Sequence, residues 1–473
     1  MPSASPCTAA ATSTPLSTQT PSTLESTEQG WETRAGQGAA VNVHPMRTRA
    51  KEGIVQPNTQ LADYVLFTEE EGQHSCLLAA EEPASYNEAK SVKGWCNAME
   101  EEMRSIVDNH TWELCQLPPG HRAIGLKWVY KLKKDAQGAV VKHKARLVAK
   151  GYVQRQGIDF EEVFAPVARM DSVRLLIALA AHHDWQVHHM DVKSVLLNGD
   201  LLEEVYVQQP PGYVQTGEEG KVLHLRKALY GLRQAPRAWN AKLDDSLITL
   251  GFERCPSEHA VYRRGTGSSL LLVGVYVDDL IITGVNMEEI TSFKQHMTRL
   301  FRMSDLGRLS FYLGIEIHQE RDRITLCQTA YAKRLLERAG LADCNSLSTP
   351  IQPRLKLSKD GVGDAVDITY YRSIIGGLRY LTHTRPDITF AVGYLSRFME
   401  APAADHYAAV KNLLRYIAGT LEYGCEFRRG NGEPKLTRFS DSDHAGDIVD
   451  RKSTTGTIFY LGESPVSWQS QKQ

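Results

Sequence analysis

Several features that would point to other classes of protein are missing from this sequence of 473 residues. Its eight cysteines are scattered without a C-x-x-C pair, which disfavours a zinc module or a disulfide framework and favours reduced thiols. The N-terminus lacks the basic-then-apolar pattern of a secretion signal. The apolar runs fall short of the roughly 18–20 residues that a membrane span needs. The sequence therefore predicts a protein of the cytoplasm or nucleus, without membrane contact.

An excess of charge of one sign is also lacking. The formal net charge of −2 disfavours a protein that coats nucleic acid through its global charge, although a local basic groove can be hidden in that sum. Neither the P-loop pattern nor a G-x-G-x-x-G between strand and helix occurs, which disfavours both nucleotide-binding classes. Residues 1–80 are rich in Ser, Thr and Pro and lack apolar clusters. We expect a disordered linker there, because such a segment cannot offset its ordering entropy.

What is present centres on Ser269–Asn286, where two short apolar runs flank Asp278 and Asp279. The β-branched runs predict buried strands, and together they predict a hairpin with both carboxylates at or beside the turn. Adjacent carboxylates repel and are costly to desolvate, so they require a shared proton or a metal ion. Two-metal phosphoryl transfer uses such a cluster. A solvated Asp-Asp turn is an equally good interpretation of these residues alone.

Asp191 is the candidate for a third carboxylate. It lies near the end of a predicted strand, residues 185–192, which follows a helix that Asp171 is expected to cap. A strand-end aspartate is more often a turn or cap residue, but beside the hairpin pair it favours a cluster of three. Four nearby histidines invite a metal-site interpretation, which their spacing disfavours because it offers no helical i,i+4 pair: His182, His183, His188 and His189.

A basic segment at residues 123–153 precedes these acids, with Asp135 as almost its only acidic residue. Its alternation predicts a hairpin with a turn at residues 135–138. A merely soluble hairpin mixes charges of both signs, so this one favours contact with phosphates. Helices are predicted at 85–108, 171–180, 236–250, 287–303, 330–339, 370–384, 386–399 and 405–420. Further strands are predicted at 205–207, 309–317 and within 436–468.

Many motifs, in order, resemble the reverse transcriptase of copia-type LTR retrotransposons. They are KARLVAKGYVQRQGIDFEEVFAPVARMDSVR, HMDVKSVLLNGDLLEEVYVQQPPGY, KALYGLRQAPRAW, YVDD and TRPDITFAVGYLSRFM. The resemblance extends from about Glu82 to Gln473. It implies an α+β right-hand polymerase with fingers and palm at residues 81–328 and a helical thumb or connection at 329–430. An incomplete RNase H-like α/β piece is implied at 431–473.

The resemblance also implies the site residues. Asp191, Asp278 and Asp279 are the expected catalytic carboxylates, holding two Mg²⁺ ions (or Mn²⁺) with the backbone of Val192. The residues expected near the incoming nucleotide are Lys133, Arg146, Leu196, Tyr230, Gly231 and Gln234. The segment Leu313-Gly314 resembles the primer grip, and Asp441 matches the first metal-binding aspartate of RNase H. The implied partners are an RNA or DNA template with its primer, dNTPs, and further copies or other proteins of the element.

Two positions depart from the family pattern. Leu196 stands where the family usually has a bulky aromatic that closes against the sugar 2′ position, which implies weaker discrimination against ribonucleotides. Ala235 replaces a usual Ser. The sequence stops before the glutamate helix of RNase H, so no RNase H activity is expected. The expected function is RNA-directed DNA polymerase, in the cytoplasm (in a virus-like particle) or the nucleus. The alternative is a catalytically inert, nucleic-acid-binding remnant.

Overall fold

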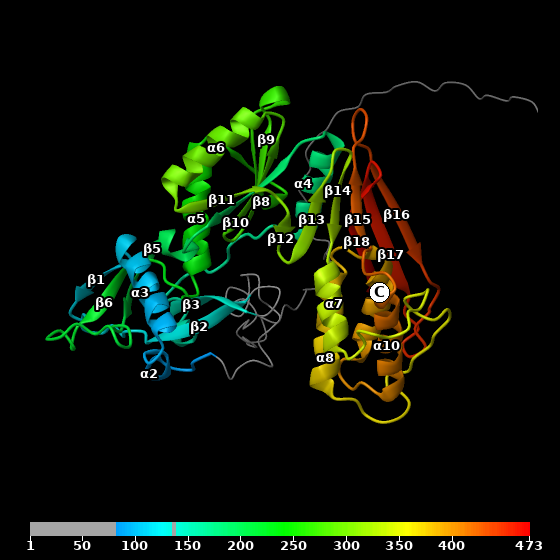
Figure 1. The fold of residues 1–473 in the computed structure, drawn as a ribbon, viewed down its shortest axis with the longest axis horizontal. Helices are drawn as coiled ribbons and strands as arrows, with labels where there is room; N and C mark the ends of the chain where they lie inside the picture. Colours follow the sequence, from blue (N-terminus) through cyan, green and yellow to red (C-terminus); the bar gives the residue numbers. More distant parts are fainter. Residues whose placement is uncertain (1–81, 135–138) are drawn as a thin grey trace, which may run out of the picture. The chain divides into compact units, whose positions relative to one another are not determined.

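A computed structural model describes residues 82–134 and 139–473 of the chain (Figure 1). The predicted linker at 1–80 and the predicted turn at 135–138 lie outside these described residues. The fold is a mixture of helices and largely antiparallel sheets, which agrees with the α+β expectation. No helix among the described residues is long and apolar enough to cross a lipid bilayer.

The first part of the described chain is built on a basic hairpin. Helices α2 (Tyr86–Ala89) and α3 (Lys93–Asp108) precede strands β1 (Trp112–Cys115), β2 (Leu126–Lys134) and β3 (Val140–Ala149). Strands β2 and β3 pair antiparallel, as predicted, and α3 packs on β3. The single helix predicted at 85–108 is divided into α2 and α3; Trp95, Met99 and Ile106 are buried on α3, whereas Val92 precedes that helix and is exposed. A separate three-stranded sheet has the order β1-β6-β5, with β5 at Asp200–Val207 and β6 at Val222–Lys227.

The central sheet has six antiparallel strands in the order β11-β4-β10-β9-β8-β7. Their bounds are β4 Val187–Val192, β7 Glu253–Cys255, β8 Glu258–Arg264, β9 Leu271–Tyr276, β10 Asp279–Gly284 and β11 Met303–Arg308. Helices α5 (Ala235–Thr249) and α6 (Met287–Leu300) share a core with Met190 and Leu280. Helix α4 (Met170–His182) shares another core with Val187 and Ile281. Side chains alternate between the two faces of a strand, so Met190 and Leu280 lie on one face of the sheet and Val187 and Ile281 on the other.

Helix α4 corrects one expectation. Arg169, not Asp171, occupies the cap position, and Asp171 lies in the first turn of the helix. There its carboxylate accepts a hydrogen bond from Arg174. Helix α5 begins at Ala235 with Pro236 in its first turn, as predicted, because a missing proline N–H is harmless at that position.

A four-stranded sheet follows, in the order β12-β13-β14-β15. Its strands are β12 (Phe311–Tyr312), β13 (Ile315–Gln319), β14 (Arg323–Cys327) and β15 (Gly424–Arg428). Between β14 and β15 the chain forms helices α7 (Thr329–Arg338), α8 (Ile368–Leu381), α9 (Thr389–Leu395) and α10 (Ala404–Ala418). These helices pack around a core of their own that includes Leu335, Ile375 and Leu413. Short 3₁₀ helices lie at Gly151–Val153, Val195–Asn198, Gly267–Ser269, Pro386–Ile388 and Ser396–Phe398.

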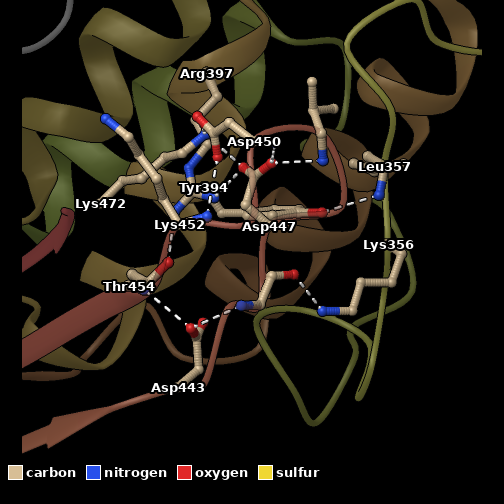
Figure 2. A network of polar contacts seen from close by, with 12 residues as sticks. Lys356, Leu357, Tyr394, Arg397, Asp443, Asp447, Asp450, Lys452, Thr454 and Lys472 are labelled. Atoms are coloured by element: carbon tan, nitrogen blue, oxygen red, sulfur yellow. Dashed lines mark hydrogen bonds and ion pairs between the residues drawn. The ribbon is translucent and has the colours of Figure 1, made fainter.

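The last sheet comprises β16 (Leu436–Ser442), β17 (Thr454–Leu461) and β18 (Ser464–Lys472), all antiparallel. The loop between β16 and β17 is held by polar contacts of Asp447, which accepts hydrogen bonds from Arg397 at 3.2 Å and Lys472 at 2.6 Å (Figure 2). Burial raises the pKa of Asp447, but the bond from Lys472 and those from the Val449 and Asp450 N–H groups hold this pKa well below its usual range. On β18, the Val466 carbonyl accepts a 2.9 Å bond from Arg174.

Candidate active site

The β9–β10 hairpin carries the two adjacent aspartates, as predicted. Tyr276 pairs with Asp279, so Val277 and Asp278 form a two-residue turn. Val277 has a φ of 55°, a conformation that a hairpin of this kind usually gives to glycine. A β-branched residue there stores strain of roughly 1–3 kcal/mol. The buried indole of Trp239 donates a 2.7 Å bond to the Val277 carbonyl and so helps to hold the strained turn.

Asp191 and Asp279 lie directly opposite each other on β4 and β10. The neighbouring pair of residues, Val192 and Asp278, is a hydrogen-bonded pair, because the Val192 N–H donates to the Asp278 carbonyl at 3.0 Å. Asp191 and Asp279 are then a non-hydrogen-bonded pair, the closer kind, whose Cα atoms are typically about 4.5 Å apart. Like charges opposite each other are destabilising. The backbone therefore gathers three carboxylates, with Asp278 buried, at one place that favours a cation.

His189 is a member of this cluster that the sequence interpretation missed. Its Nε2 donates a 2.6 Å hydrogen bond to Oδ1 of Asp279, and only 8% of the residue is exposed. The available signal was the two-residue spacing before Asp191, which places both side chains on one face of β4. His188 points the other way, where Lys294 donates to its Nδ1 at 2.9 Å. Burial, with the charge of Lys294 second, lowers the pKa of His188.

The other two histidines of the predicted set also have separate partners. His182 contacts the Gly432 carbonyl at 2.8 Å, and the ring of His183 stacks on Trp185. A different group of potential metal ligands occurs on β13 and β14. Glu316, His318 and Cys327 have ligand atoms within 4.8 Å of one another, but Glu316 already accepts the Ala330 N–H at the start of α7.

Tyr312 lies beside the cluster. Its ring meets His189 edge to face with centroids 5.7 Å apart, and its buried hydroxyl has no hydrogen-bond partner among the described residues. Burial, followed by the negative charges of Asp279 and Asp278, raises the pKa of Tyr312 well above its usual value. The phenol therefore remains a donor. A carboxylate cluster with an unsatisfied donor nearby fits a hydrated divalent cation with oxygen ligands, such as Mg²⁺ or Mn²⁺.

The residues predicted near the nucleotide occupy varied environments. The guanidinium of Arg146 lies over the ring of Tyr230 at 4.8 Å, and the Ala149 N–H donates to the Tyr230 carbonyl at 2.7 Å. Gly231 has a φ of 86°, and this segment packs so closely on β3 that a Cβ there would collide with the Ala149 carbonyl oxygen. Lys133 lies on β2, opposite Lys142.

Gln234 and Leu196 are both buried. The Gln234 amide accepts from Gln154 and donates to the Asp159 carbonyl, each at 3.0 Å, so its contacts hold the loop that follows β3. Leu196 belongs to the hydrophobic core and has no exposed surface. Contact of either side chain with a nucleotide stays a prediction, and for Leu196 it needs a conformation that uncovers the side chain.

The remaining predicted residues lie in turns and on the last sheet. Leu313 and Gly314 form a two-residue turn between β12 and β13, with φ values of 49° and 76°. The Tyr380 hydroxyl donates to the Leu313 carbonyl and fixes this turn. Asp441 is exposed on β16, and Ala235 is buried at the start of α5.

Fold and site together define an α+β protein with a carboxylate cluster suited to divalent cations and a basic hairpin upstream of it. Residues 109–353 match the family described as reverse transcriptase (RNA-dependent DNA polymerase). The chain belongs to this reverse transcriptase family, which confirms the resemblance drawn from its motifs. Enzymes of the family generally use divalent metal ions.

Curated relatives extend the match. The chain is 39% identical over 436 residues to the Retrovirus-related Pol polyprotein from transposon RE1 of Arabidopsis thaliana, covering 92% of this chain and 29% of the relative. It is 38% identical to the corresponding polyprotein from transposon TNT 1-94 of Nicotiana tabacum, covering 91% and 32%. It is 35% identical to the putative transposon Ty5-1 protein YCL074W of Saccharomyces cerevisiae, covering 60% and 92%. The chain thus spans less than a third of the two plant polyproteins.

Proposed function

We propose that this chain is an RNA-directed DNA polymerase that extends a primer 3′ end by two-metal nucleotidyl transfer. The observation that supports the proposal best is the pairing of Asp191 with Asp279 across two strands, with Asp278 in the adjoining turn. The partners are an RNA or DNA template with its primer and dNTPs. The chemistry joins the primer 3′ oxygen to the α-phosphorus of a dNTP and releases pyrophosphate.

Bound divalent ions would be held by Asp191, Asp278 and Asp279 and would supply positive charge to the attacking and leaving oxygens. The rest of the work is positioning and charge neutralisation, as is usual in phosphoryl transfer. Arg146, steadied by its cation–π contact with Tyr230, and Lys133 provide positive charge for the triphosphate.

The turn at Leu313-Gly314 is proposed to hold the primer backbone. Its anchorage by the Tyr380 hydroxyl limits its freedom, and rigid placement of the primer 3′ hydroxyl favours an in-line attack. The carbonyl oxygens and peptide planes of the turn are fixed by two positive φ angles. Tyr312, which immediately precedes the turn, connects it to the carboxylate cluster through the ring contact with His189.

The test is primer extension on an RNA template with Mg²⁺ and dNTPs, comparing the native chain with Asp278→Asn. This substitution keeps the shape of the side chain and removes its charge. We expect extension to fall by about 10³-fold, because charge stabilisation by a metal ion contributes several kcal/mol. Replacing dNTPs by rNTPs, with Leu196→Phe as the matched variant, tests sugar selection.

A nucleic-acid-binding protein without catalysis is the second candidate. Its motivation is Leu196, which stands at a position where the family usually has an aromatic residue. Folded native protein that binds the primer–template, measured by fluorescence anisotropy, but yields no extended product would favour this candidate over the polymerase.

A further inference from the structure

We propose that His189 is a positioning residue that holds the Asp279 carboxylate in one orientation for a divalent cation. The inference rests on the proposed function, because it concerns the same carboxylate cluster. It assigns a role to a side chain that neither contacts the substrate nor supplies a metal ligand in the proposal above.

The alternation of β4 brings His189 to the cluster. Asp191 and His189 are two residues apart and therefore share one face of the strand. Asp279 lies opposite Asp191, and Ile281 lies opposite His189, so the imidazole reaches diagonally to the carboxylate of Asp279. Register on both sides of β4 fixes this arrangement, since the strand pairs with β10 and with β11.

The bond itself is short and sheltered. A carboxylate only accepts, so the proton of the 2.6 Å contact belongs to Nε2 of His189. Hydrogen bonds to ionised groups are stronger than neutral ones, and the side chains of His189 and Asp279 are only 10% and 18% exposed. Oδ1 of Asp279 is thereby engaged, and Oδ2 is the oxygen left to face a cation.

The orientation of the carboxylate matters because Asp191 repels it. Two unrestrained carboxylates at opposed strand positions would rotate apart, and a cation would have to draw them together again. A hydrogen bond that fixes one of them in advance lowers the entropy lost on metal binding. Partners of this kind behind metal-binding groups typically raise metal affinity by about 10–100-fold.

The imidazole is itself confined. The ring of Tyr312 lies edge to face against it, and Tyr312 is almost fully buried. Tyr312 directly precedes the Leu313-Gly314 turn, whose Leu313 carbonyl is fixed by Tyr380. His189 consequently has packed neighbours on the ring side and a carboxylate on the nitrogen side, which is the setting of a positioning group.

The experiment measures Mn²⁺ binding to the full chain by electron paramagnetic resonance, without nucleic acid and without turnover. His189→Leu removes the donor, whereas His189→Gln retains an N–H near the place of Nε2. We expect His189→Leu to weaken Mn²⁺ binding by about 10–100-fold and His189→Gln to remain within a few-fold of the native chain. His183→Leu, which removes a histidine stacked on Trp185 outside the cluster, is the control and should change nothing.

The outcomes separate the inference from the proposed function. Mn²⁺ binding that is unaffected by Asp278→Asn would contradict the proposed metal site. Binding that depends on Asp278 but is equally tight in His189→Leu would overturn the role of His189 and leave the polymerase proposal standing. If His189→Leu does not fold, as judged by its thermal transition, His189→Asn replaces it, since its shorter amide cannot reach Asp279. Equal binding by the Asn and Gln variants would then refute the inference.

Discussion

Gly231 and Gly217 form a natural pair for testing how tightly the segment at residues 228–234 is fastened to the basic hairpin. Both adopt nearly the same left-handed backbone, with φ values of 86° and 85°. Their surroundings differ. A Cβ added to Gly231 would collide with the Ala149 carbonyl oxygen and with Cγ1 of Val148, whereas one added to Gly217 would meet no atom within 4 Å. Alanine at each position therefore separates backbone strain from crowding.

The expected magnitudes follow from this difference. An L-residue in the left-handed region costs about 1–2 kcal/mol, and Gly217→Ala should show this penalty alone. Overpacking in a well-packed region costs about 1–3 kcal/mol more, so Gly231→Ala should destabilise by about 2–5 kcal/mol in total. The collision in Gly231→Ala is with strand β3 itself, because the nearest atom is the backbone carbonyl oxygen of Ala149.

Hydrogen exchange at the Ala149 amide gives the local measurement, since this N–H donates to the Tyr230 carbonyl at 2.7 Å. Gly231→Ala should accelerate its exchange by at least tenfold and lower the thermal midpoint. Gly217→Ala should leave this amide protected and lower the midpoint slightly. Equal effects of the two substitutions, or an Ala149 amide unchanged in Gly231→Ala, would refute the argument that close packing requires glycine here.

Three further predictions concern buried polar groups. Arg174→Met should destabilise the chain by about 3 kcal/mol and speed limited proteolysis of β18, because the carbonyls of buried Val466 and half-buried His383 lose a charged donor. Replacing His188 by Gln should reduce the stability that the chain loses below pH 6.5. The measurement is the thermal midpoint of the native chain and of the variant between pH 5 and 7. Because the pKa of His188 is lower in the folded chain than in the unfolded chain, the unfolded chain takes up the proton first as pH falls. The free energy of unfolding therefore decreases as the pH is lowered. Trp239→Phe should cost about 1 kcal/mol and slow primer extension, since the strained turn before Asp278 loses its donor; unchanged extension would contradict this.

The β9–β10 hairpin was predictable because its signals are local. Short β-branched runs around Asp278 and Asp279 predicted two strands and a turn, and the structure confirms all three. Strand β15 was not predicted, since Gly424–Arg428 is short and pairs with β14 only after four intervening helices. Sequence periodicity carries no information about a partner that distant. The capping role expected of Asp171 was wrong by two positions, since Arg169 is the cap, and helix ends are the least certain part of such predictions.

The carboxylates of the site were predictable by type, but their surroundings were not. Asp191 could be joined to the hairpin pair because all three are acids at strand ends. His189 was weighed only as a metal ligand in a set of four histidines, and its bond to Asp279 depends on the register of β4 against β10. Nothing in local sequence specifies that register. The same holds for Gln234, whose buried amide contacts come from a loop far along the chain.

Strand β4 explains why core and candidate site are inseparable in this chain. Met190 and Val192 pack into the core behind the sheet, while His189 and Asp191 face the opposite side. A register slip of one residue would exchange the two faces, burying a carboxylate in the core and moving an apolar side chain to the cluster. That slip is opposed from both edges, by pairing with β10 and with the irregular strand β11. The packing of Met190 in the core therefore also keeps Asp191 opposite Asp279. Substitutions in the core behind the sheet should disturb metal binding before they unfold the chain.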